Sequence, residues 1–415
     1  MVTLTQARYD AIIIGAGPAG MMAAMTAAGH GRKVLLLEKM PHAGRKLLIS
    51  GKGRCNLTNA GSVDKFLKKF SDSGVFLRNT FAIFFNDNLC DFFESAGCKL
   101  KTERGERVFP QSDKSVDILN VLTGRLAESG VEIKYNKEVV DIISGNGIKT
   151  VILKDASRFF ALKVVIATGG LSYPGTGSTG SGFKLAGKLR HTVINPKPGL
   201  VPVITKSGVP KKLTGVSLEN VKCAVISDNK VIEDRLGDML FTHFGLSGPI
   251  ILDLSATIFD LMKSGKRVFI SINLKPGLDE KKLDARLQRE FNAHPSRALK
   301  NIFTELLPQK LVTEFLKYCG INELKKANQV TKEERKKLMG GLFDFRFEIA
   351  GTKPIEDAII TRGGVFTKEI DPKTMESKIV EGIYFAGEII DVDAKTGGYN
   401  MQAAFSTGFV CGMNI

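Results

Sequence analysis

The beginning of the chain consists of apolar runs separated by glycine-rich turns. Residues Tyr9–Ile14 form an apolar run that ends at Gly15, which is typical of a buried parallel strand. The Ala- and Met-rich segment Pro18–Ala28 then predicts a helix that stops at Gly29, and Lys33–Leu37 predicts a second buried strand. Strand, helix and strand follow one another within about 30 residues, which is the length of one βαβ unit.

Helical and β-type patterns continue to alternate after this unit. Helices are predicted over residues 76–96 and 115–129, and each pattern is followed by a glycine. Strands are predicted at residues 131–134, 138–143 and 163–167. This alternation favours an α/β fold with a largely parallel sheet.

The pattern changes near residue 190. Short β-type runs at residues 201–205, 221–226 and 267–274 are followed by a strongly basic helical stretch, 279–337. Near Phe343 the chain becomes β-type again, and it ends with a predicted strand at 382–386 and a predicted helix at about 400–411.

We therefore predict a discontinuous, Rossmann-like α/β domain that is interrupted by an insertion. The α/β domain would comprise residues 1–190 and 345–415. A β-rich, barrel-like insertion would cover residues 191–275 and 338–344, and a small helical subdomain would cover 276–337.

The first turn carries the pattern G-x-G-x-x-G, from Gly15 to Gly20. In such a turn the first glycine permits a tight bend, and the second, Gly17, lets the backbone approach a pyrophosphate. The third glycine allows close helix–strand packing. Glu38 ends the second predicted strand, where a carboxylate binds ribose hydroxyls. Strand, turn, helix and acid together predict a dinucleotide site, but they do not distinguish NAD from FAD.

Four further glycine-containing segments extend this site. The basic loop Gly44–Asn56 can lay cations and backbone amides along a pyrophosphate and a flavin. A buried strand ends at Thr168-Gly169-Gly170, and the last predicted strand ends at Gly387-Glu388. A Gly-Gly turn, Gly397-Gly398, then opens the final helix, whose N-terminus would stabilise negative charge on a reduced flavin. An ordinary basic loop and a capped helix are the alternative interpretations.

These segments resemble the YhiN/BaiN-type family of bacterial NAD(P)/FAD-dependent oxidoreductases, within the glutathione-reductase-like class. The matching strings are Ala11 to Gly20, Gly44 to Asn59, Leu171 to Gly180, Leu240 to Pro249, Met375 to Lys378 and Gly387 to Gln402. The resemblance implies a two-part FAD domain with an inserted β-barrel and a helical subdomain. It also implies FAD as cofactor and NAD(P)H as a transient electron donor. Ser181 departs from the family, where an Asp is expected.

The predicted cofactor site combines the motif residues with those that the resemblance adds. It comprises Gly15, Ala16, Gly17, Pro18, Ala19, Gly20, Glu38, Lys39, Arg45, Lys46, Ser50, Gly51, Arg54, Cys55, Asn56, Val139, Ala167, Thr168, Gly169, Gly387, Glu388, Gly398, Asn400, Met401 and Gln402.

The catalytic group is not identified by the sequence. His243 can act as an acid or base, and Cys55 can be a thiol close to the flavin, but a structural role is the stronger interpretation of each. The turn Gly177–Gly182 is either a second phosphate-binding turn, for NAD(P)H, or the start of the following helix. The six cysteines include no C-x-x-C pair, so a zinc site and a dithiol motif are unsupported and a reducing compartment is favoured.

Composition adds a second hypothesis about function. There are 59 Lys and Arg residues against 43 Asp and Glu, which gives a formal charge of +16. A basic surface can attract an anionic cofactor, a nucleic acid or an acidic membrane, or it can simply be solvated. No membrane span or signal segment is predicted, and a cytoplasmic protein is expected.

We therefore expect an FAD-dependent reductase or oxidase of a small organic substrate. An FAD-dependent nucleic-acid-modifying protein and a non-catalytic flavin-binding module are the alternatives.

Overall fold

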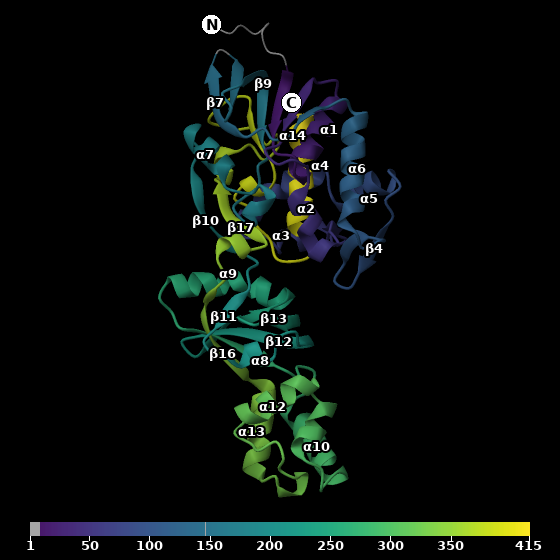
Figure 1. Ribbon diagram of the computed structural model, residues 1–415, viewed down its shortest axis with the longest axis vertical. Coiled ribbons are helices and arrows are strands. Elements are labelled where there is room, and N and C mark those ends of the chain that lie inside the picture. The colour runs from purple at the N-terminus through teal and green to yellow at the C-terminus, as the bar shows by residue number, and fades with distance from the viewer. Residues whose placement is uncertain (1–8, 146) are drawn as a thin grey trace. The chain divides into compact units, whose positions relative to one another are not determined.

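A mostly parallel sheet forms the centre of the first structural unit. The computed structural model describes residues 9–145 and 147–415, and this unit comprises the described residues up to Gly199 together with Ala358–Ile415. The strand order is β6-β2-β1-β9-β8-β7, and β18 also pairs with β9; Figure 1 labels β7 and β9 of this sheet. The strands are β1 (Tyr9–Ile14), β2 (Val34–Leu37), β6 (Glu132–Lys134), β7 (Val139–Gly145), β8 (Ile148–Leu153), β9 (Arg158–Ile166) and β18 (Ile383–Phe385).

The sheet has a parallel part and an antiparallel part. β6, β2, β1, β9 and β18 run parallel, whereas β7 and β8 are antiparallel to their neighbours. β9 is long enough to serve both parts, because its first half pairs with β8 and its second half with β18. The strands from the two ends of the chain therefore meet on β9.

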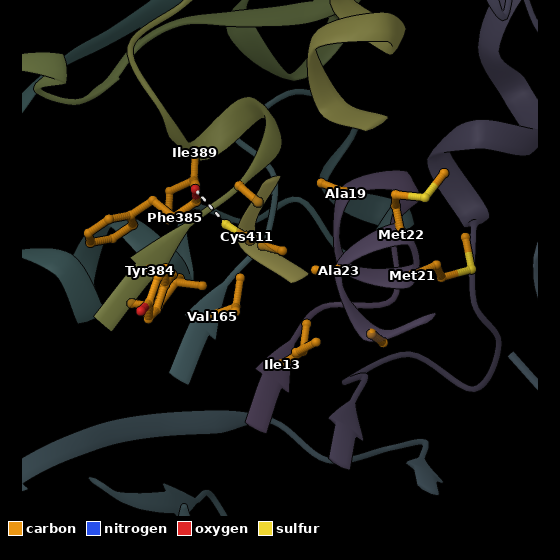
Figure 2. Packing of buried hydrophobic residues seen from close by; sticks show 14 of the residues in the cluster. Ile13, Ala19, Met21, Met22, Ala23, Val165, Tyr384, Phe385, Ile389 and Cys411 are labelled. Carbon is orange, nitrogen blue, oxygen red and sulfur yellow. Dashed lines mark hydrogen bonds between the residues drawn. The ribbon is translucent and has the colours of Figure 1, made fainter. Parts of the chain in front are cut away.

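Helix α1 (Pro18–Gly29) lies between α14 (Tyr399–Met413) and α6 (Ser115–Glu128), with contacts to both. Figure 2 shows the buried layer that these elements share with the sheet, in which Ile13 of β1 and Val165 of β9 lie near Ala23 of α1. Cys411 of α14 donates a hydrogen bond from Sγ to the carbonyl oxygen of Phe385, at 3.4 Å. This layer fixes the first and last helices to the same face.

Small residues allow α1 and α14 to approach closely. A Cβ atom on Gly408 would collide with the carbonyl oxygen of Ala19, and one on Gly412 would lie 2.6 Å from that of Ala23. Because real Cβ contacts are never so short, only glycine fits at these two positions of α14.

The remaining elements of the first unit are short. The helices are α2 (Arg45–Ile49), α3 (Val63–Leu67), α4 (Arg78–Ile83), α5 (Asn86–Glu94) and α7 (Ser181–Lys188). The strands are β3 (Thr58–Asn59), β4 (Leu100–Glu103) and β5 (Arg107–Pro110), which form a small sheet, and β10 (Val193–Gly199) and β17 (Ile360–Val365), which form a pair.

The single helix expected over residues 76–96 is two helices. Phe84 is extended, with φ −141° and ψ 109°, and it separates α4 from α5. Asn88 then accepts a hydrogen bond from the backbone N–H of Phe85, at 2.9 Å, which caps the start of α5. The apolar pattern continued through this break because both phenylalanines pack into the core.

The second unit, Leu200–Asp357, contains a closed barrel and a group of helices. The barrel order is β11-β14-β13-β12-β15-β16. Its strands are β11 (Val203–Thr205), β12 (Ser217–Ser227), β13 (Lys230–Phe241), β14 (Gly245–Ser247), β15 (Val268–Asn273) and β16 (Phe345–Thr352). The helices are α8 (Val209–Lys212), α9 (Pro249–Lys263), α10 (Glu280–Ala293), α11 (Leu299–Ile302), α12 (Gln309–Tyr318) and α13 (Lys332–Phe343). Barrel and helices share one core.

The predicted fold class, a Rossmann-like domain with an inserted β-barrel and a helical region, is confirmed. The unit boundaries lie at 199/200 and 357/358, some residues away from the expected 190 and 345. The difference at the second boundary arises because β16 closes the barrel by pairing with β11 and β15.

The close contact between α1 and α14 can be tested with two Gly→Ala variants. We expect Gly408→Ala to lower the unfolding free energy by about 1–3 kcal/mol, because its Cβ displaces the backbone of α1. Gly124→Ala is the matched control: Gly124 lies within α6 with nothing within 4 Å of its Cβ position. There, alanine should stabilise the protein by about 0.5–1 kcal/mol. Chemical unfolding would measure the change in unfolding free energy for both variants. Equal changes in Gly408→Ala and Gly124→Ala would contradict the close contact between α1 and α14.

Candidate active site at the carboxyl edge of the sheet

Four parallel strands of the first unit end at the same level of the sheet. Ile14 of β1 pairs with Leu37 of β2 and with Ile166 of β9, and Ile166 also pairs with Phe385 of β18. Each of these is the last residue of its strand. The segments that follow therefore start side by side, at the edge where ligands bind in open α/β sheets. They carry the predicted site residues 15–20, 38–39, 167–169 and 387–388.

The glycine-rich turn after β1 has two glycines that are required for packing and one that faces open space. Gly15 has φ 105°, and a Cβ on it would lie 2.6 Å from the carbonyl oxygen of Ala167. A Cβ on Gly20 would collide with the carbonyl oxygen of Gly15. A Cβ on Gly17 would meet no atom within 4 Å. The open space at Gly17 is the cradle that a pyrophosphate requires.

Helix α1 begins at this cradle with its N-terminus unblocked. Gly17 is the N-cap, Pro18 is the first helical residue, and the first turn contains neither a side-chain cap nor an acidic residue. The free N–H groups and the positive end of the helix dipole are thus available to an anion.

Glu38 directly follows β2 and is 9% exposed. Its Oε2 accepts a hydrogen bond from the N–H of Ala16 at 2.7 Å, and its Oε1 accepts one from the N–H of Met40 at 2.8 Å. A carboxylate accepts about four hydrogen bonds, so acceptor positions remain for ribose hydroxyls. Lys137 donates its N–H to the carbonyl oxygen of Glu38 at 2.9 Å, which brings the buried Val139 close to this end of β2.

Among the four cations of the basic loop, Arg54 is already engaged by the protein. It forms ion pairs with Glu103 and Asp113, and hydrogen bonds to both carboxylates raise the pKa of its guanidinium. The guanidinium also lies 4.2 Å from the centre of the Phe109 ring. These contacts tie the loop to β4 and β5 rather than leaving Arg54 free for a phosphate.

Arg45 and the exposed Lys52 are the cations of this loop that remain available. Gly44 donates its N–H to the carbonyl oxygen of Ala16 at 2.9 Å, so Arg45 starts beside the glycine-rich turn. Within residues 9–145 and 147–415, no hydrogen bond or ion pair engages its guanidinium. A free guanidinium beside an anion cradle suits a phosphate, which it can bind through two parallel N–H groups.

Lys46 and Glu388 form an ion pair that joins α2 to the end of β18. Lys46 Nζ donates to Glu388 Oε2 at 2.7 Å and to Ser172 Oγ at 2.6 Å. Glu388 Oε1 also accepts hydrogen bonds from Ser172 Oγ at 3.2 Å and from the N–H of Thr361 at 2.8 Å. Oε1 is therefore fully used, whereas Oε2, which accepts only from Lys46, keeps a free acceptor position.

Gly387 places this pair beside α1. It has φ 76°, and a Cβ on it would lie 2.8 Å from the Cβ of Ala19 in the first turn of α1.

Thr168 and Gly169 follow β9 at the same edge. The Thr168 hydroxyl is buried and lies against α7, where a Cβ on Gly182 would collide with it. Any contact of Thr168 and Gly169 with a cofactor is thus left to their backbone.

Buried side chains hold the start of α14 against the basic loop. Thr58 donates from Oγ1 to Gln402 Oε1 at 2.5 Å, and Gln402 donates from Nε2 to Ser406 Oγ at 2.9 Å. A Cβ on Gly398 would collide with the carbonyl oxygen of Thr58. The Gln402 side chain is fully buried in this network, so only its backbone remains available to a cofactor.

Two asparagines complete the connection. With its amide oriented to suit its neighbours, Asn56 accepts a hydrogen bond from the N–H of Gly398 at 2.9 Å and donates to the carbonyl oxygen of Thr58 at 3.1 Å. Asn400 accepts from the N–H of Ala394 and donates to its carbonyl oxygen, both at 2.9 Å. Both side chains hold the backbone around the N-terminus of α14, which has no side-chain cap and no acidic residue in its first turn.

The two catalytic candidates lie in different units. Cys55 is fully buried, and this burial raises the pKa of its thiol to about 12, so it is protonated at neutral pH and packs in the core. His243 belongs to the second unit, where it is an exposed residue between β13 and β14.

Ser50, a predicted cofactor residue, is engaged by its own segment: its Oγ donates a hydrogen bond to the carbonyl oxygen of Leu47 at 2.7 Å.

Three hydroxyl residues that sequence reasoning missed hold this site together: Thr58, Ser172 and Thr361. Ser172 lies in a segment that the family resemblance singled out, two residues after Gly170, so its position was a usable signal. Thr361 gave no signal, because its partners are distant in the sequence.

The described residues contain no group of three or more His, Cys, Asp or Glu side chains arranged to hold a metal ion. None of their helices combines the length and the apolar character that a membrane crossing requires.

Comparison with known proteins matches this chain over almost its whole length. The family model described as HI0933-like protein Rossmann domain matches residues 9–414. The ribosomal RNA dihydrouridine synthase of Escherichia coli K12 is 34% identical over 98% of both chains. The 3-dehydro-bile acid delta(4,6)-reductase of Clostridium scindens is 31% identical over 96% of this chain and 97% of its own.

Among solved structures, a 3-ketosteroid-delta4-(5alpha)-dehydrogenase from Rhodococcus jostii RHA1 is similar in fold. Its TM-score is 0.51 at 15% identity, and the match covers 99% of this chain and 98% of that one.

The open space at Gly17 provides a clean test of the cofactor site. We expect Gly17→Val to fold normally, because a Cβ at this position meets no protein atom within 4 Å, and to lose FAD, because the side chain fills the phosphate cradle. The flavin absorbance of purified protein, together with its melting temperature, measures both effects. A stable variant that retained FAD as the wild type does would contradict the site.

Proposed function

Because the chain belongs to the HI0933-like Rossmann-domain family of FAD-dependent oxidoreductases, we propose that it reduces a carbon–carbon double bond conjugated to a carbonyl group. The substrate would be a small organic molecule, and NAD(P)H would supply the electrons. The chemistry named in two full-length relatives carries this proposal.

Both names describe one type of bond. Dihydrouridine is uridine in which the C5–C6 double bond, conjugated to the C4 carbonyl, has been reduced. A delta(4,6)-reductase of a 3-dehydro-bile acid acts on double bonds that extend the conjugation of the 3-oxo group. In each case the carbonyl draws electron density from the double bond, so that the far carbon accepts hydride and the near carbon accepts a proton.

The residues of the first unit suit a bound FAD, whose chemistry is the exchange of hydride. The cradle at Gly17, the N-terminus of α1 and the free guanidinium of Arg45 would hold its phosphates. Glu38 would bind the ribose, and Oε2 of Glu388 would bind the ribityl chain. The N-terminus of α14 would stabilise negative charge on the reduced ring.

The electron balance of this reaction requires a donor of two electrons. NAD(P)H is oxidised to NAD(P)⁺ as it reduces the flavin, and the substrate then takes up one hydride and one proton. A second G-x-G-x-x-G string, Gly175–Gly180, precedes α7, but a Cβ on its middle glycine, Gly177, would lie 3.0 Å from Met40 Cγ, so it forms no cradle like the one at Gly17. This fits a nicotinamide donor that binds and leaves rather than a permanently bound one.

An anaerobic experiment tests the reaction. We expect NADH or NADPH to bleach the flavin absorbance of the holoprotein, and a conjugated enone to restore it while being reduced to the saturated ketone. The matched control is the same ketone without the double bond, which should not reoxidise the flavin. Reoxidation by oxygen but by no conjugated carbonyl compound would contradict the proposal and indicate an oxidase.

A second candidate is the same reaction on a uracil ring within RNA, and one observation favours it. The E. coli relative that is named for ribosomal RNA is 34% identical over nearly the full length of both chains. The formal charge of +16 is compatible with an RNA partner. We place it second because many cations are already paired, as Arg335 is with Asp284 and Lys325 with Glu334.

The RNA candidate has its own test. Ribosomal RNA incubated with the holoprotein and NADPH would be digested to nucleosides, and dihydrouridine would be measured by mass. Formation of dihydrouridine, together with RNA affinity that falls steeply as salt rises, would favour RNA over a small substrate. Unmodified RNA alongside rapid reduction of an enone would exclude it.

A further inference from the structure

The loop of residues 171–180 joins β9 to α7 and contains the second glycine-rich turn of the site. Sequence analysis left Gly177–Gly182 as either a second phosphate-binding turn or the start of a helix. In the structure α7 begins at Ser181, and its N-cap Gly180 is left-handed with φ 73°. A Cβ on Gly182 would also meet Ile389 Cδ1 at 2.7 Å. The first turn of α7 is therefore packed against protein, which leaves no cradle like the one at Gly17.

The base of this loop is fixed to the carboxyl edge of the sheet. Gly180 donates its N–H to the carbonyl oxygen of Gly170 at 3.0 Å, which closes the loop on itself. Leu171 donates its N–H to Thr361 Oγ1 at 2.7 Å, and Ser172 is fully buried. Because both ends are held, the loop has a defined position beside the end of β2.

The far end of the loop contacts the residues that follow Glu38. Lys39 Nζ donates to Thr179 Oγ1 at 2.6 Å, across 140 positions of sequence. A Cβ on Gly177 would lie 3.0 Å from Met40 Cγ, so the backbone of the loop lies against the Met40 side chain there. Met40 in turn donates its N–H to Glu38 Oε1. The loop is thus connected, through Lys39 and Met40, to the carboxylate proposed to bind the ribose.

The hydrogen bond between Lys39 and Thr179 involves a charged group. Burial lowers the pKa of the Lys39 ammonium group, while Glu138 and Glu38 raise it. The hydrogen bond from the protonated ammonium group to Thr179 is charge-assisted, which makes it stronger than a bond between neutral groups.

We propose that Lys39 and Thr179 form a clasp that closes the 171–180 loop over the adenosine half of FAD. The turn Gly177–Gly182 is then a wall of the first nucleotide site, and Lys39 and Thr179 are positioning residues that slow the release of the cofactor. This inference rests on the cofactor position given under the proposed function.

The clasp makes a prediction about which half of FAD is affected. In Thr179→Val the side chain keeps its size but loses the hydroxyl that Lys39 binds. We expect FAD to leave full-length holoprotein about tenfold faster, and ADP to bind the FAD-depleted protein about tenfold more weakly, as for a lost charge-assisted hydrogen bond. FMN, which lacks the adenosine half, should bind unchanged. Flavin fluorescence and calorimetry measure these quantities, and none of them depends on catalytic activity.

Two variants control for general damage. Thr179→Ser keeps the hydroxyl and should retain wild-type FAD release. Lys188→Met removes a lysine of α7 that donates to the carbonyl oxygen of Val140 at 3.1 Å, away from the clasp, and it should also have no effect. If Thr179→Val fails to fold, Lys39→Met breaks the same hydrogen bond from the other side.

The outcomes separate this inference from the proposed site. Wild-type ADP affinity in both Thr179→Val and Lys39→Met would overturn the clasp. Wild-type protein that binds FMN but no ADP would instead overturn the placement of the adenosine half. Weaker binding of ADP and of FMN alike would show a general loss of structure and would also overturn the clasp.

Discussion

The close approach of backbone to backbone around the first turn of α1 is the constraint on which the first unit depends. Gly20 packs on Gly15, Gly387 on Ala19, and Gly408 on the carbonyl oxygen of Ala19. A side chain at any of these glycines would separate β1, β18 and α14 from the start of α1. The same contacts bring the two distant parts of the chain to one edge of the sheet, where Gly17, unlike these glycines, has open space beside it.

Buried polar networks then give this edge its chemistry. Thr58, Gln402 and Ser406 fix the N-terminus of α14, and Ser172, Thr361 and Lys46 fix the carboxylate of Glu388. Buried polar groups are costly unless they are paired, so each network specifies one arrangement of segments that are hundreds of residues apart. A carboxylate held by several donors also keeps its orientation before any ligand arrives.

Local patterns in the sequence predicted the parts of this site that a short segment determines alone. Tyr9–Ile14 is a strand with the predicted bounds, and the helix expected from Pro18 begins there. The roles of Gly15, Gly17 and Gly20 follow from one turn. In contrast, the partners of Lys46 and Arg54 depend on pairings across 342 and 59 positions, which no single sequence displays. The break at Phe84 was hidden because the apolar pattern continues through it.

Those pairings change what the positive charge of the site means. The basic loop looked uniform in sequence, with Arg45, Lys46 and Arg54 as equal phosphate ligands. In the structure Arg54 is neutralised by Glu103 and Asp113, and Lys46 is neutralised by Glu388. Since a paired cation attracts a distant anion only weakly, the loop presents two free charges, on Arg45 and Lys52, together with the N-termini of α1 and α14. Selectivity for an anionic cofactor therefore comes from these few positive groups, which point toward one cradle. The formal charge of +16 adds only a general attraction for anions, which salt would screen.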